Sequence, residues 1–189
     1  MNRHYLLAST SPRRKELLEL LGLAFTVIGS NVEETFDEAI PIEEAIMDLA
    51  YQKALAVFRN HKDEIVLGFD TDVIVDGVIL GKPKDAEDAK RMLRLLSDKT
   101  HVVVTGGAIL SKAVSTSFYE KARVTFFPMD EAEIDTYVAT GEPFDKAGAY
   151  AVQGFGARYI KSIQGDFYTI MGLPVARLYH ELKRLGLGE

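Results

Sequence analysis

The sequence of 189 residues contains no cysteine and no tryptophan. Without cysteine there can be no disulfide bond, no thiolate nucleophile and no Cys-ligated zinc or iron–sulfur site. No apolar run approaches the ~20 residues that a helix needs to cross a bilayer. The apolar stretch after Met1 is also too short for a secretory signal. We therefore expect a cytoplasmic protein with no membrane partner.

Basic residues are in the minority. The chain has 22 Lys and Arg against 28 Asp and Glu, a formal net charge of −6. A chain of that sign does not bind nucleic acid through its overall field, so we expect no nucleic-acid partner. Any polyanionic ligand would have to meet cations that the fold gathers locally. The hydrophobic share of 47% can fill a real core and excludes a disordered chain.

Apolar periodicity switches between two and 3.6 residues along the chain, which predicts a mixed α/β fold. With no internal repeat and no Gly-, Pro- or Ser-rich linker, residues 1–189 read as a single domain. Asp76-Gly77 predicts a hairpin, and Gly106-Gly107 predicts a turn between two strands. Residues 141–172 are expected to form loops and short strands. Helices are expected after Pro12, Pro41, Asp85, Asp130 and Pro174, and strands over 5–8, 25–28, 65–69, 73–75, 78–80, 102–104 and 118–126.

The first predicted helix breaks an electrostatic rule. Arg13, Arg14 and Lys15 stand at its amino end, where the helix dipole already presents about +0.5 charge. The hydroxyls of residues 9–11 precede these cations, with free backbone N–H groups close by. Any one of these cations alone reads as an ordinary solvated side chain. As a group at a strand-to-helix turn, they predict a phosphate site.

Carboxylates follow a predicted buried strand. Asp70 is expected at the end of that strand, the usual place for ligand groups in α/β sheets, with Asp72 on the same side. Such carboxylates can hold a hard divalent cation or activate a water, and Thr71 adds a hydroxyl. For Asp72, a cap beside the hairpin explains the residue at least as well. Glu33 and Glu34 offer further metal oxygens or form an ordinary acidic surface loop.

Three more polar residues are candidates for ligand contacts. Lys53 falls in the apolar stripe of its helix and either extends to solvent or meets a negative ligand. The Gly81-Lys82-Pro83 turn does not fit a phosphate-loop pattern, but its stiffness suits a single phosphate contact. Gln153 can donate and accept hydrogen bonds at once, as discrimination of a pyrimidine edge would require.

Taken together, several segments resemble the Maf family of nucleoside triphosphate pyrophosphatases. They are LASTSPRR at 7–14, DT at 70–71, GKP at 81–83, GEPFDKAGAYAVQG at 141–154 and GLP at 172–174. The similarity runs almost from end to end, and the ordered combination is far more specific than any single piece. The segment at 141–154 resembles the subgroup that acts on dTTP and UTP.

The resemblance implies a curved mixed α/β sheet with flanking helices and two lobes around a central cleft, often as a homodimer. It also implies hydrolysis of dTTP or UTP between the α and β phosphates, with a divalent cation (Mg or Mn) as cofactor. By position, Asp70 would be the general base or a metal-associated carboxylate, and Glu33 would help hold the metal. The implied substrate-binding residues are Ser9, Arg13, Arg14, Lys53, Thr71, Lys82 and Gln153.

The corresponding mechanism is in-line attack of an activated water on the α phosphate, with pyrophosphate as the leaving group. A triphosphate carries about four negative charges, which calls for a metal and several cations. A second hypothesis is a nucleotide-binding regulator of septum formation or cell division that performs no catalysis. A third is a general phosphatase, which would release orthophosphate instead of pyrophosphate.

Overall fold

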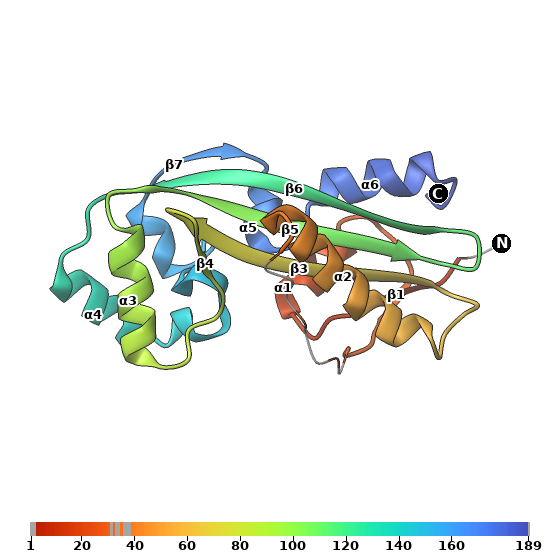
Figure 1. The fold of residues 1–189 in the computed structure, drawn as a ribbon, viewed down its shortest axis with the longest axis horizontal. Helices are drawn as coiled ribbons and strands as arrows, with labels where there is room; N and C mark the ends of the chain where they lie inside the picture. Colours follow the sequence, from red (N-terminus) through yellow and green to blue (C-terminus); the bar gives the residue numbers. More distant parts are fainter. Residues whose placement is uncertain (1–2, 31, 33–34, 36–38, 189) are drawn as a thin grey trace. The chain divides into compact units, whose positions relative to one another are not determined.

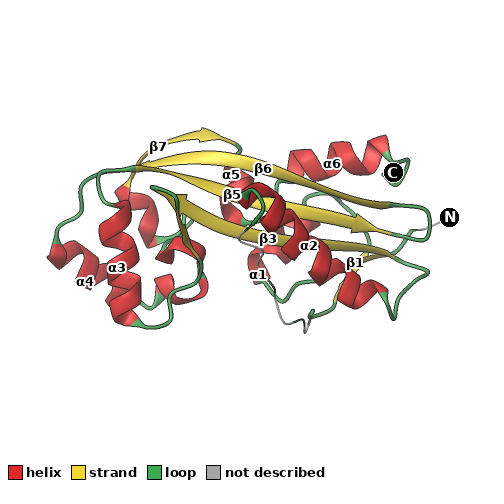
Figure 2. Ribbon diagram, viewed as in Figure 1, coloured by secondary structure: helices red, strands yellow, loops and turns green. Residues whose placement is uncertain are grey.

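A mixed β-sheet of seven strands forms the framework of the computed structural model, which describes residues 3–30, 32, 35 and 39–188 (Figures 1 and 2). The strand order is β2-β1-β3-β5-β6-β7, and β4 pairs with β3. The strands are β1 (Tyr5–Leu7), β2 (Phe25–Val27), β3 (Ile65–Val75), β4 (Val78–Leu80), β5 (Thr100–Leu110), β6 (Ser115–Phe126) and β7 (Ile160–Gly165). This sheet and its helices confirm the predicted mixed α/β class.

The helices connect and cover these strands. They are α1 (Pro12–Glu19), α2 (Ile42–Phe58), α3 (Ala86–Leu96), α4 (Glu131–Ala139), α5 (Phe167–Met171) and α6 (Val175–Arg184), with 3-10 turns η1 (Glu142–Asp145), η2 (Ala147–Ala149) and η3 (Phe155–Tyr159). The five predicted helices are all present, whereas α5 was not predicted. The chain divides into two compact units: unit 1 is Met1–Asp70, Thr105–Glu120 and Gly172–Glu189, and unit 2 is Thr71–Val104 and Lys121–Met171.

In unit 1, β1 lies between two parallel neighbours, β2 and β3. Helix α1 joins β1 to β2, and α2 leads back from β2 to β3, so the two connections run in opposite directions across the sheet. Because such crossovers are right-handed, α1 and α2 cover opposite faces. The apolar stripe predicted for α2 is buried, and it packs on even-numbered residues of β1, β3 and β5 and on Ala8, which follows β1. This cluster consists of Leu6, Ala8, Ala50, Ala54, Val57, Val66, Ala108 and Leu110.

Glycines let α2 come unusually close to the sheet. A Cβ atom on Gly68 of β3 would lie 2.3 Å from the carbonyl oxygen of Ala50, and one on Gly106 of β5 would lie 2.6 Å from that of Ile46. Figure 1 shows α2 lying along these strands. Any larger residue at either position would push the helix backbone away.

The predicted turn at Gly106-Gly107 is wrong, because both glycines lie inside the continuous strand β5. Successive residues of a strand point to opposite faces. Gly106 makes room for α2 on one face, and Gly107 makes room for the ring of Phe118 on the other, 2.4 Å from where a Cβ would lie. The glycine pair therefore reflects close packing on both sides of the sheet.

Unit 2 contains the predicted hairpin and the starts of two predicted helices. Asp76 and Gly77 have φ angles of 50° and 77° and connect β3 to antiparallel β4, as a two-residue hairpin turn requires. The Asp85 carboxylate accepts a hydrogen bond from the Asp88 amide at the start of α3. A capping box between Asp130 and Glu133 starts α4.

A histidine is buried in unit 2 among aromatic rings. His101 is 1% exposed, and its Nε2 lies 2.8 Å from the Tyr150 hydroxyl. The rings of Phe126 and Tyr150 meet the imidazole edge to face. Its Nδ1 has no hydrogen-bond partner among the described residues. Burial lowers the pKa of His101 to about 4, so the neutral ring is the form that the fold accommodates.

This burial predicts a loss of stability in mild acid. In the unfolded chain His101 titrates near pH 6.5, so below that pH the unfolded state binds the proton that the folded state excludes. Between pH 7 and pH 5 the free energy of unfolding should fall by about 2 kcal/mol more in the wild type than in His101→Gln. Urea denaturation at both pH values measures the difference. Equal losses in the two proteins would contradict the assignment.

Candidate active site

A nearly buried ion pair joins α2 to β3 in unit 1. The ammonium of Lys53 contacts Oδ1 of Asp70, and the two side chains are only 12% and 10% exposed. Asp70 follows Gly68 by two residues and therefore points to the same face of β3, toward α2. Of the two interpretations of Lys53, extension into solvent is excluded, because its charge meets a carboxylate of the protein.

Because both side chains are nearly buried, the Lys53 and Asp70 charges depend on each other. A charge removed from water must be paired, and deleting one partner of a buried pair typically costs 3–5 kcal/mol. Lys53 has at least one interaction besides Asp70. The other carboxylate oxygen of Asp70, Oδ2, has no hydrogen-bond partner among the described residues. The pair thus orients Asp70 through one oxygen and leaves the second able to accept a proton or bind a cation.

Asp70 does not end its strand, contrary to prediction. Strand β3 continues without interruption to Val75 and forms one arm of the hairpin. Val73 and Val75 remain buried, which explains why pairing persists past the polar residues. Thr71 and Asp72 are half-buried within this strand, and each has an interaction within the protein.

Ser9 and Arg14 form a second polar group in unit 1. Ser9 is 7% exposed, and its hydroxyl oxygen accepts hydrogen bonds from the Ser11 amide (3.2 Å) and from Arg14 Nη1 (3.4 Å). Arg14 Nε donates to the carbonyl of Gly172 at 2.9 Å. Arg14 therefore ties the start of α1 to the segment before α6, a structural role beyond the predicted phosphate contact.

The two groups of unit 1 lie beyond the paired ends of neighbouring strands. Leu7 of β1 is in register with Leu67 of parallel β3, and the Ala8 amide donates to the Leu67 carbonyl. Ser9 and Asp70 follow in the same direction along the two strands. The first turn of α1 has no acidic residue and its N-cap has no side-chain hydrogen bond, while half-buried Arg13 stands there. These features suit an anion.

Lys82 and Gln153 belong to unit 2. Lys82 follows β4, is exposed, and makes no hydrogen bond or ion pair with any described residue. The carbonyl of Gly81 accepts a hydrogen bond from the Gly148 amide, which connects this turn to the segment at 146–150. Gly148 has a φ of +69°, and a Cβ there would lie 2.8 Å from Val73. The turn that presents Lys82 is therefore well supported.

Gln153 is exposed in a segment that is predicted to form loops and short strands. The carboxylate of Glu142 accepts hydrogen bonds from the amides of Phe155 and Gly156 and from the hydroxyl of Tyr137. Burial alone would raise the pKa of the Glu142 carboxyl, but these hydrogen bonds outweigh it, so the net shift is downward. The role of Glu142 was missed. The available signal was the pair of glycines, Gly154 and Gly156, downstream.

The donor set for a metal is small. In the part of the chain that the structure describes, no group of three His, Asp or Glu residues could hold a metal ion. Glu33, the second predicted ligand, lies outside the described residues. Mg²⁺ is commonly bound by one or two carboxylates together with waters and substrate phosphates. The available oxygen of Asp70 fits such a site, in which most ligands come from the substrate.

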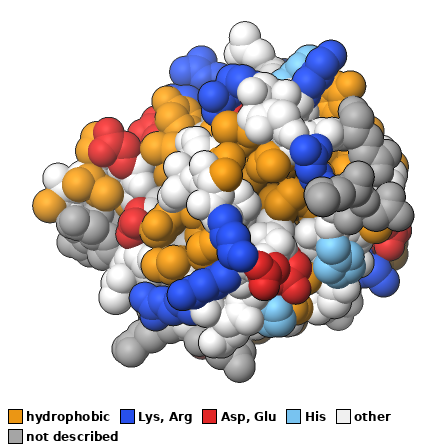
Figure 3. Space-filling view, turned by 90° about the vertical axis from the view of Figure 1, so that its right-hand side faces the viewer, with side chains coloured by type: hydrophobic (Ala, Val, Ile, Leu, Met, Phe, Trp, Pro, Cys, Tyr) orange, Lys and Arg blue, Asp and Glu red, His pale blue; other side chains and the backbone are white. Residues whose placement is uncertain are grey.

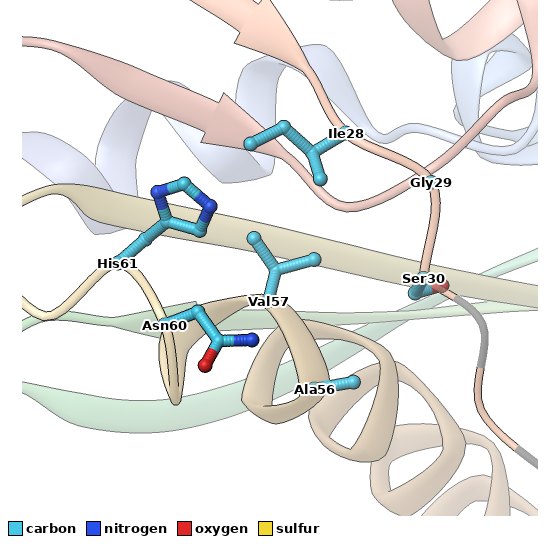
Figure 4. A pocket seen from close by; sticks show the side chains of 7 residues that line it. All are labelled: Ile28, Gly29, Ser30, Ala56, Val57, Asn60 and His61. Atoms are coloured by element: carbon cyan, nitrogen blue, oxygen red, sulfur yellow. The ribbon is translucent and has the colours of Figure 1, made fainter.

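A pocket of about 240 Å³ opens elsewhere in unit 1 (Figure 4). The residues after β2 form one side of it, and the end of α2 with the following turn forms the other. It is lined by Ile28, Gly29, Ser30, Ala56, Val57, Asn60 and His61. None of the predicted site residues lines this pocket, so it adds nothing to the candidate site.

Basic side chains are dispersed over one face of the molecule. On the face shown in Figure 3, Lys and Arg side chains occur in separate groups, divided by acidic, apolar and neutral ones.

None of the helices in residues 3–30 and 39–188 is both long and apolar enough to span a bilayer.

Comparison with known proteins gives a consistent result. A family model described as Maf-like protein matches residues 4–185. A dTTP/UTP pyrophosphatase from Bacillus cytotoxicus is 54% identical over 186 residues, 98% of this chain and 97% of that protein. A protein of the same name from Bacillus cereus is 52% identical over 185 residues, with the same shares covered.

Among solved structures, the Ham1 protein of Staphylococcus aureus is similar with a TM-score of 0.50 and 16% identity. The match covers 84% of this chain and 80% of that one, and it supports the fold alone. The match of the family model over nearly all of the sequence, together with relatives above 50% identity, establishes that this chain belongs to the Maf family.

Proposed function

We propose that this protein is a nucleoside triphosphate pyrophosphatase that converts dTTP and UTP to the monophosphate and pyrophosphate. The names of relatives that share more than half of its residues support this activity. The observation that carries the proposal is the nearly buried contact between Lys53 and Asp70. It fixes a carboxylate through one oxygen and leaves the other able to act as a base.

In this mechanism Asp70 accepts a proton from the attacking water. The water oxygen forms a bond to the α phosphorus as the bond to the bridging oxygen breaks, and pyrophosphate leaves with that oxygen. Ser9, Arg13 and Arg14 stabilise charge on the phosphates from the start of α1. Lys82 and Thr71 supply further contacts, Lys53 orients Asp70, and Gln153 contacts the base.

We propose a divalent cation, Mg or Mn, as the cofactor. Asp70 and Glu33 would hold it together with phosphate oxygens, and it would neutralise charge on the triphosphate. The available Asp70 oxygen would coordinate the cation as the alternative to its role as the base.

The chain's net charge of −6 supports the absence of a nucleic-acid partner. We also propose that the protein is cytoplasmic and has no membrane partner. Resemblance to the Maf family favours a homodimer.

A nucleotide panel tests the reaction itself. With Mg²⁺ or Mn²⁺, the purified protein should release pyrophosphate from dTTP and UTP, and little orthophosphate. Separate assays for the two products measure this directly. Release of orthophosphate would indicate a general phosphatase. Binding of dTTP without any product would support the regulator of cell division that performs no catalysis.

Replacing the proposed base should separate binding from turnover. Asp70→Asn keeps an oxygen for Lys53 but cannot take a proton, so kcat should fall roughly 10²–10⁴-fold while dTTP binding persists. Steady-state kinetics and equilibrium binding measure the two effects. Asp76→Asn is the matched control, because Asp76 lies in the hairpin turn, where asparagine also tolerates its positive φ. Near-normal turnover in Asp70→Asn would remove Asp70 from the base role.

Lys82 offers a test of a phosphate contact without a folding penalty. Because Lys82 has no partner among the described residues, Lys82→Ala should leave the thermal midpoint unchanged while raising the KM for dTTP roughly ten-fold. Lys84→Ala removes an exposed neighbouring ammonium and should keep the wild-type KM. If both variants have the wild-type KM and kcat, Lys82 does not contact the substrate.

A further inference from the structure

Glu142 holds the segment that carries Gln153. Its Oε1 accepts a hydrogen bond from the Phe155 amide, and its Oε2 accepts one from the Gly156 amide, both at 2.9 Å. One carboxylate thus binds two successive amides, directly after the residues Gln153-Gly154. Hydrogen bonds to an ionised acceptor are stronger than neutral ones, so this contact restrains the backbone firmly.

Tyr137 holds the other end of the same segment. Its hydroxyl donates to Glu142 Oε2 at 2.7 Å and accepts a hydrogen bond from the Ala151 amide at 3.0 Å. Tyr137 is 1% exposed in α4. Burial, followed by the Glu142 carboxylate, raises the pKa of its phenol, so the hydroxyl keeps its proton. Residues 151–156 are therefore fastened at both ends to one hydrogen-bonded pair, Tyr137 and Glu142.

The two glycines of this segment are required by that contact. A Cβ on Gly154 would lie 2.1 Å from Glu142 Oε1, and a Cβ on Gly156 would lie 2.7 Å from the Tyr137 hydroxyl. A side chain at either position would displace the carboxylate or the phenol. The sequence thus has glycine at the two positions where the contact with Glu142 and Tyr137 leaves no room for a Cβ atom.

Gln153 differs from its neighbours in this segment. Ala151, Val152 and Gly156 are buried, whereas Gln153 is exposed and makes no hydrogen bond with a described residue. Its backbone is fixed on both sides while its amide remains available. A glutamine amide has a donor end and an acceptor end, so its position relative to a base edge decides which pattern it can match.

We propose that Glu142, acting with Tyr137, is a positioning residue that sets the base selectivity of the site by holding the backbone of Gln153. This inference rests on the proposed pyrophosphatase activity and on contact between Gln153 and the base. It assigns Glu142 no contact with the substrate. Loosening the segment should therefore weaken the choice among pyrimidines more than it slows turnover of dTTP.

The test compares Glu142→Gln and Tyr137→Phe with the wild type, using dTTP and dCTP as substrates. Glu142→Gln replaces one acceptor oxygen by an NH₂ group that cannot accept from a backbone amide. The ratio of kcat/KM for dTTP to that for dCTP should fall about ten-fold, and the kcat for dTTP should stay within about two-fold. Tyr137→Phe, which removes only a hydroxyl, should change the ratio in the same direction. Glu131→Gln, at an exposed position of α4, is the matched control and should leave the ratio unchanged.

A double-mutant cycle shows whether Glu142 acts through Gln153. If it does, Glu142→Gln should change the ratio no further once Gln153→Ala is present, because the side chain through which Glu142 acts is already absent. Additive effects of the two substitutions would overturn the inference, as would an unchanged ratio in Glu142→Gln. Equal losses of activity toward dTTP and dCTP would show a merely structural role and would also overturn it.

Amide hydrogen exchange gives a readout that needs no substrate. In Glu142→Gln the Phe155 and Gly156 amides should exchange faster than in the wild type, while those of α4 should keep their rates. Unchanged exchange at residues 155 and 156 would refute the positioning role even in an active enzyme. A wild type that hydrolyses neither nucleotide would instead refute the proposed function, and the selectivity role with it.

Discussion

The contact between Lys53 and Asp70 depends on the close approach of α2 to the sheet. Gly68 and Gly106 leave no side chain between the helix and strands β3 and β5; Ala50 and Ala54 face Gly68, and the backbone at Ile46 faces Gly106. A larger residue at these positions would move the helix outward and separate the ammonium from the carboxylate. Both side chains of the ion pair are nearly buried, so an unpaired charge at either residue would be costly. The close packing of α2 on the sheet and the contact between Lys53 and Asp70 therefore depend on the same residues.

Helix and strand patterns were read correctly where the signal was local. The hairpin at Asp76-Gly77 and the capping box at Asp130 depend on a few adjacent residues, and both are present. Gly106-Gly107 was misread, because glycine serves both turns and close packing, and only the position of α2 distinguishes them. Asp70 was placed at a strand end for a similar reason: polar residues usually end a buried strand, but Val73 and Val75 continue its burial.

The candidate site was predictable in its residue types but not in its contacts. Lys53 was recognised as a cation in an apolar stripe, yet its partner depends on which residue of β3 lies beneath that turn of α2. Glu142 was visible only as part of a motif, because its partners lie 5 to 14 residues away and are mostly backbone amides. No periodicity encodes such contacts. They depend on the tertiary path of the chain between α4 and η3.

The contacts that the basic residues already make within the protein limit how this acidic chain could bind a triphosphate. Lys53 is matched by Asp70, Arg14 is bonded to Gly172 and Ser9, and the Lys146 ammonium lies 2.5 Å from Asp145. The carboxylates offset much of the charge of Lys53 and Lys146, whereas the hydrogen bonds of Arg14 to Gly172 and Ser9 fix its position without neutralising it. Lys82, exposed and without a partner among the described residues, has its full charge to offer. The remaining phosphate charge would then fall to Arg13, to the amides of α1 and to the proposed divalent cation, which explains why an acidic protein would need the metal as much as its own basic residues.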